Sequence, residues 1–259
     1  MNKYRFLQVI LVLIFFISAG IFSYQMVYLP MKNREAAERL KEDFPEGNAP
    51  SGKEPAGEEG QVPSVDLAAL REKYPDIQGW LTIPGTGVDY PVLQSGKSSP
   101  EYYLRRNYQG EWDINGSLFL QWNCKVPDGR NLIIYGHNMN SGAMFGNLDN
   151  YADAGYCREH PTIFFQTMKG VTEYEIVSVM KADIRMFPFQ QAEFQDMEGL
   201  RDYLLQAEAL GLFHVKGQDE MEKQDVVENA EQVLTLVTCS YEWKNARNVV
   251  VAVKRGIVE

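Results

Sequence analysis

Residues 234–239 read LTLVTC, and residues 248–253 read NVVVAV. Both runs are apolar and rich in β-branched residues, and polar residues bound them, which is typical of short buried β-strands. If the two strands pair as a hairpin, Arg247 lies across from Cys239. These stretches therefore predict a β-rich fold with a cysteine and an arginine together at one end of a hairpin.

Six further runs of similar character precede this hairpin, and turn residues bound each of them. Together with the two strands of the hairpin, these six runs give eight predicted strands. They lie at residues 80–83, 88–93, 117–121, 131–135, 162–165, 173–181, 233–238 and 248–253. The run at 173–181 alternates with a period of two, as expected of a half-buried strand. About eight short strands with few helices favour a mainly β, closed or nearly closed barrel over a doubly wound sheet.

Two helices are expected beside these strands. The first begins near Ser64, which is a suitable N-cap, and ends before Pro75. The second covers about residues 196–210 and has an apolar stripe opposite a charged face. It is inserted before the cysteine strand.

The amino-terminal part is expected to lie outside this domain. Residues 6–29 carry no charge, and a helix rising about 1.5 Å per residue would cross a membrane core of about 30 Å. A membrane anchor at residues 1–30 is favoured over a cleaved signal peptide, because the run continues beyond residues 18–20. Residues 31–63 are expected to be a flexible stalk, and residues 64–259 an extracytoplasmic domain of a single-pass membrane protein.

Composition narrows the classes of function. The chain has 259 residues, a formal net charge of −10 and three cysteines. Because an acidic chain is repelled by phosphates, no nucleic-acid partner is expected. No cysteine–histidine cluster has the spacing of a metal site, so no metal is expected. Cys124 and Cys157 are expected to be structural, and a disulfide between them stays open.

Three residues are candidates for chemistry. Cys239 ends a strand before a polar loop, which suits a nucleophile; the alternative is a buried core cysteine. His137 follows the strand at 131–135 through Gly136, which allows the chain to turn; the alternative is a satisfied turn histidine. Arg247 could stabilise an oxyanion, or could be a solvated arginine at a strand end.

Several motifs, in the same order along the chain, resemble those of the sortase family. TLVTCSYE at residues 235–242, with an arginine at 247, resembles the sortase cysteine signature, and IIYGHNM at 133–139 resembles the histidine segment. YPDIQGWLTIPGT at 74–86 and YYLRRN at 102–107 resemble the start of the class B catalytic domain. The resemblance runs from about residue 74 to residue 253.

The resemblance implies an eight-stranded sortase-like barrel and a cysteine transpeptidase that needs no cofactor. Cys239 would attack a threonine carbonyl in the C-terminal sorting motif of a secreted protein. His137 would protonate the leaving amide nitrogen, and Arg247 would stabilise the oxyanion. An amine of a peptidoglycan precursor would then resolve the thioester.

Four other residues are expected to bind substrate: Tyr135, Thr238, Ile184 and Ser240. Val237 and Ser240 stand where some class B members carry polar and acidic residues, so no motif preference is transferred. Two other functions are weighed against the transpeptidase, namely a secreted cysteine peptidase and a non-catalytic surface-binding barrel. Arg247 argues against a papain-type peptidase, and a Cys239 inert to alkylation would favour the binding barrel.

Overall fold

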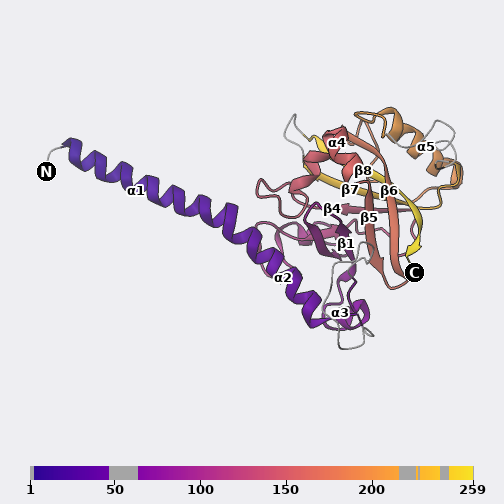
Figure 1. Cartoon of the computed structure of the whole chain (residues 1–259), viewed down its shortest axis with the longest axis horizontal. Helices are drawn as coiled ribbons and strands as arrows, with labels where there is room; N and C mark the ends of the chain where they lie inside the picture. Colours follow the sequence, from indigo (N-terminus) through magenta and orange to yellow (C-terminus); the bar gives the residue numbers. More distant parts are fainter. Residues whose placement is uncertain (1–2, 47–63, 216–225, 227, 240–244, 259) are drawn as a thin grey trace.

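The computed structural model describes residues 3–46, 64–215, 226, 228–239 and 245–258 (Figure 1). Eight strands form a closed barrel in the order β1-β2-β3-β4-β7-β8-β6-β5. They are β1 (Ile77–Ile83), β2 (Val88–Gln94), β3 (Leu118–Leu120), β4 (Asn131–Tyr135), β5 (Thr162–Thr167), β6 (Gly170–Ala182), β7 (Val233–Cys239) and β8 (Arg247–Val258). Each predicted strand is present, and the prediction of a mainly β barrel is confirmed.

Strands β4 and β7 are mostly apolar, and both of their faces are covered, since residues 131–134 and 233–238 are all buried. Residues 248–253 of β8 are all buried. Helix α5 (Met197–Ala209) packs by its buried apolar stripe, and its Tyr203 hydroxyl lies 3.0 Å from the Thr235 hydroxyl of β7. The predicted helix before the cysteine strand is therefore confirmed, and it covers part of the strand that carries Cys239.

The register of β4, β7 and β8 brings three strand ends together. Strands β4 and β7 are parallel and pair from Asn131↔Val233 to Tyr135↔Val237. Strands β7 and β8 are antiparallel, and their final pair is Cys239↔Arg247. The predicted hairpin is thus confirmed, with the cysteine and the arginine directly opposite each other.

Several short helices pack around the barrel. They are α3 (Leu67–Lys73), η2 (Tyr102–Arg105), η3 (Gly146–Ala152) and α4 (Ala154–Glu159). The N-cap of α3 is Asp66, whose side chain accepts a hydrogen bond from the Ala69 amide at 3.0 Å. The expected cap, Ser64, lies two residues too early to reach that turn.

The amino-terminal region corrects one expectation. The uncharged run at residues 6–29 is divided among α1 (Lys3–Ser23), the π-helix η1 (Tyr24–Tyr28) and α2 (Leu29–Asp43). Among the helices of the described residues, none is long and apolar enough to cross a membrane. The expected anchor at residues 1–30, and with it the single-pass membrane location, is contradicted.

Helix α1 points away from the barrel, whereas α2 lies beside it (Figure 1). Ala37 and Leu40 of α2 are buried, and Lys41 forms an ion pair with Asp89 of β2. Residues 47–63 of the expected stalk lie outside the described residues. The boundaries at residues 30 and 63 stay predictions.

Candidate active site

A groove of about 550 Å³ opens at the barrel end where β4 and β7 end and β8 begins. Five predicted site residues line it: Tyr135, His137, Ile184, Thr238 and Arg247. Cys239 is described as the last residue of β7, through its backbone pairing with Arg247. Ser240 lies outside the described residues.

The backbone arrangement puts His137, Cys239 and Arg247 in one row. The parallel register ends at Tyr135↔Val237, and His137 and Cys239 each lie two residues further along. The Gly136 amide donates to the Val237 carbonyl at 3.2 Å, so the strands stay adjacent to this point. Because Arg247 pairs with Cys239 from the other side, the cysteine backbone lies between the other two residues.

The imidazole of His137 is held by a backbone carbonyl. Its Nε2 lies 2.7 Å from the Leu104 oxygen. A carbonyl only accepts hydrogen bonds, so Nε2 carries the hydrogen and Nδ1 is left for proton transfer. Burial lowers the pKa of His137 below its ordinary value; the Leu104 bond opposes that shift, and the charge of Arg105 adds to it.

Two glycines shape the surroundings of His137. Gly116 has a φ of +61°, and a Cβ there would lie 2.4 Å from the Leu104 oxygen. Gly136 does not have a positive φ, but a Cβ would lie 2.5 Å from Leu118 Cδ2. Gly136 is therefore required for close packing rather than for the turn that the sequence suggested.

Arg247 is partly exposed in the groove. Its Nη1 donates to the Ala246 carbonyl at 2.9 Å, and the guanidinium has further donors that suit an anion. Arg247 also affects Tyr135. Burial raises the pKa of the Tyr135 hydroxyl, and the positive charge of Arg247 opposes that shift.

Tyr135 belongs to a hydrogen-bonded wall of the groove. Its hydroxyl donates to Gln121 Oε1 at 2.8 Å, and its ring stacks on Phe119 with centroids 5.5 Å apart. Gln121 Nε2 in turn donates to the Gln190 carbonyl at 2.8 Å. Sequence reasoning missed Gln121 and Gln190, because neither stands in a motif.

Thr238 and Ile184 differ in what they offer a ligand. Thr238 is only 2% exposed, and its hydroxyl donates to the Gly136 carbonyl at 2.7 Å. Its hydroxyl thus ties β7 to the end of β4. Ile184 is 47% exposed and sits in a turn where Asp183 accepts from the Arg185 amide at 2.8 Å. Ile184 therefore presents apolar surface to the groove.

The other two cysteines are free and buried. Burial raises the pKa of both the Cys124 and the Cys157 thiol to about 11. Both thiols are therefore overwhelmingly protonated at neutral pH. Within the described ranges there is no group of three or more histidine, cysteine or acidic residues able to hold a metal ion.

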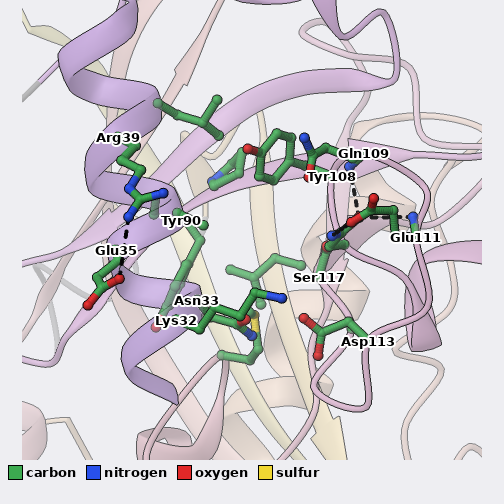
Figure 2. A pocket seen from close by; sticks show the side chains of 18 of the residues that line it. Lys32, Asn33, Glu35, Arg39, Tyr90, Tyr108, Gln109, Glu111, Asp113 and Ser117 are labelled. Carbon is green, nitrogen blue, oxygen red and sulfur yellow. Dashed lines mark hydrogen bonds and ion pairs between the residues drawn. The ribbon is translucent and has the colours of Figure 1, made fainter. Parts of the chain in front are cut away.

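A second cavity, of about 380 Å³, lies between α2 and the loop at residues 107–117 (Figure 2). Some of the polar side chains that line it interact with one another. Glu35 forms an ion pair with Arg39, and Glu111 accepts a hydrogen bond from the Asn107 side chain. It contains none of the predicted site residues. The groove at the strand ends is the candidate active site.

Comparisons with known proteins agree with this geometry. The family model described as "Sortase domain" matches residues 81–255. Sortase B of Listeria monocytogenes is 34% identical over 179 residues, which cover 68% of each chain. The structure of Clostridium perfringens sortase B matches with a TM-score of 0.63 and 27% identity, covering 73% of this chain and 99% of that one. Staphylococcus aureus sortase B shares the fold at 19% identity, with a TM-score of 0.68 and coverage of 88% and 99%.

Proposed function

We propose that this chain, which belongs to the sortase family of cysteine transpeptidases and to class B within it, cleaves a C-terminal sorting motif at a threonine carbonyl. The acyl group would pass through a thioester to an amine of the cell wall. Sortases act on secreted proteins that carry such motifs. The observation that supports the proposal best is the backbone row of His137, Cys239 and Arg247 beside one groove.

In the first step the Cys239 thiolate attacks the threonine carbonyl carbon and a C–S bond forms. The carbonyl oxygen becomes an oxyanion, which the Arg247 guanidinium stabilises. The C–N bond then breaks, and the departing nitrogen takes a proton from His137 Nδ1, since Nε2–H is held by the Leu104 carbonyl. The products are a thioester and a released amine.

In the second step an acceptor amine attacks the thioester. His137 Nδ1 takes a proton from the attacking nitrogen, so the imidazole returns to its charged form. The oxyanion forms again beside Arg247, and its collapse expels the Cys239 thiolate. A new amide bond replaces the one that was cleaved, so no external energy source is needed.

The lowered pKa of His137 bears on the rate. The charged imidazole needed to protonate the leaving nitrogen is a minority species at neutral pH, because burial disfavours it. Only molecules that combine this imidazolium with a Cys239 thiolate would react. We therefore expect slow turnover and an acid limb of the pH profile below pH 6.5, the ordinary histidine value.

A peptide panel tests the proposed function. Fluorogenic peptides varied around NPxTx and xPxTG are incubated with the full chain, with and without amine acceptors, and mass spectrometry identifies the products. We expect cleavage after threonine and, with an acceptor, a new amide at that carbonyl. Cleavage that yields only a free acid at every acceptor concentration would instead indicate the cysteine peptidase.

A further inference from the structure

Asp149 joins two segments of the active site that the barrel does not connect directly. It lies on η3, where its Oδ2 accepts a hydrogen bond from Asn138 Nδ2 at 2.8 Å. Its Oδ1 accepts from Asn248 Nδ2. Asn138 immediately follows His137, and Asn248 immediately follows Arg247. One carboxylate therefore bridges the histidine loop and the arginine strand.

The two amides that meet Asp149 are buried. Asn138 is 7% exposed and Asn248 is 3% exposed. Buried N–H groups need acceptors, and bonds to a carboxylate are stronger than bonds between neutral groups. Asp149 itself is exposed, while η3 is anchored by the buried side chains of Leu148 and Tyr151. Its removal would therefore remove an acceptor from two buried amides without opening a cavity in the core.

The barrel itself does not join β4 directly to β8. Strand β7 lies between β4 and β8, so these two strands share no ladder. Strand β4 ends at Tyr135. Beyond it, the His137 carbonyl accepts a hydrogen bond from the Phe145 amide at 3.0 Å. The Asp149 bridge connects this loop to β8 across the position of β7.

We infer that Asp149 is a positioning residue: its carboxylate fixes His137 relative to Arg247, so that the acid and the oxyanion donor act on the nitrogen and the oxygen of the same peptide bond. This inference rests on the proposed function of those two residues. A carboxylate suits the task because each oxygen meets one N–H group. An asparagine would turn its own NH₂ group toward one of these donors, so at least one bond would be lost unless a neighbouring amide turned over.

The test compares Asp149→Ala and Asp149→Asn with Asp153→Ala in the full chain. Asp153 is an exposed acid nearby whose Oδ1 caps α4 by accepting from the Tyr156 amide at 2.9 Å. Because a displacement of about 1 Å can cost about 100-fold in rate, we expect Asp149→Ala to lower kcat by about 10- to 100-fold with little change in KM. Asp149→Asn should fall between it and the wild type. Asp153→Ala should lower the melting temperature but keep kcat.

A second measurement needs no peptide substrate. The rate of Cys239 alkylation is followed against pH, with the modified residue identified by peptide mapping. Asp149→Ala should change this profile, because a displaced His137 no longer exchanges a proton with the thiol in the same way, whereas Asp153→Ala should leave it unchanged. If Asp149→Ala does not fold, Asp149→Asn, which keeps the volume, is used for both measurements.

The outcomes separate this inference from the proposed function. Wild-type kcat and an unchanged alkylation profile in the Asp149 variants would overturn the positioning role and leave the transpeptidase intact. Equal losses in Asp149→Ala and Asp153→Ala would also overturn it, since both would then reflect stability. A wild-type chain that turns over no peptide would defeat the proposed function, while the alkylation profiles would still decide the role of Asp149.

Discussion

The two sides of the groove are built in different ways. On one side, Cys239 and Arg247 are partners in the regular ladder between β7 and β8. On the other, His137 lies beyond the end of β4 and is held by the Leu104 carbonyl and the Phe145 amide. The first side depends on strand register, while the second depends on individual hydrogen bonds with residues outside the strands. The ladder side should tolerate changes around it, and the loop side should not.

The largest effect is expected on the ladder side at Cys239. Cys239→Ala should abolish thioester formation, because neither of the other cysteines is available as a thiolate at this site. The matched control is Cys124→Ala with Cys157→Ala, which removes two buried thiols of raised pKa. Peptide turnover should persist in that double variant if it folds. Loss of turnover in a folded control would assign a catalytic role to one of those thiols.

The next effect separates charge from geometry at Arg247. Arg247→Lys keeps the positive charge but loses the planar fork of donors, so turnover should fall by about 10²- to 10³-fold, the scale for one oxyanion donor. Arg255→Lys is the matched control. Arg255 lies on the same strand as Arg247, but its guanidinium forms an ion pair with Glu175 and does not face the groove. Wild-type kcat in Arg247→Lys would mean that another group holds the oxyanion.

The loop side can be disturbed through Gly116, which does not line the groove. Gly116→Ala would force a Cβ against the Leu104 oxygen at a positive φ, so it should move the carbonyl that holds His137. We expect kcat to fall about tenfold, as for a displacement of less than 1 Å. Gly96→Ala is the control, because nothing lies within 4 Å of a Cβ there. Equal activity per folded molecule in both variants would show that the Leu104 contact does not position the histidine.

The smallest effect concerns the charge near His137. Arg105 disfavours the imidazolium and so lowers the pKa of His137. Arg105→Ala removes that repulsion, the pKa rises, and the acid limb of kcat/KM should move to higher pH. Arg130→Ala is the control, because each arginine donates a guanidinium hydrogen bond to a backbone carbonyl: Arg105 to Ile114 and Arg130 to Glu231. A limb that stays in place, or moves to lower pH, would contradict the assignment of this limb to His137.

The same contrast explains what could be predicted from the sequence. Alternation and β-branched runs predicted all eight strands, and residues 131–135 were placed with the bounds of β4. The pairing of Cys239 with Arg247 followed from the hairpin. The Leu104 acceptor could not be predicted, because a backbone carbonyl has no residue signature. Nor could Asp149, because its role depends on how η3 packs.

In the amino-terminal region, by contrast, the sequence pattern predicts a feature that the structure does not contain. Hydropathy over residues 6–29 predicted one spanning helix, but hydropathy does not report where helical geometry changes. The structure interrupts the run at Ser23 with a π-helix and continues into the charged helix α2. A pattern of uncharged residues therefore predicts one element where the chain forms three.

The most direct test of the account is the identity of the acylated residue. The full chain is mixed with a sorting peptide without an acceptor amine, and intact and peptide-level mass spectrometry follow the adduct. We predict a single acyl group, removed by hydroxylamine as expected of a thioester, on Cys239 and absent from Cys239→Ala. An adduct on Cys124 or Cys157, or turnover of peptide by Cys239→Ala, would contradict the account.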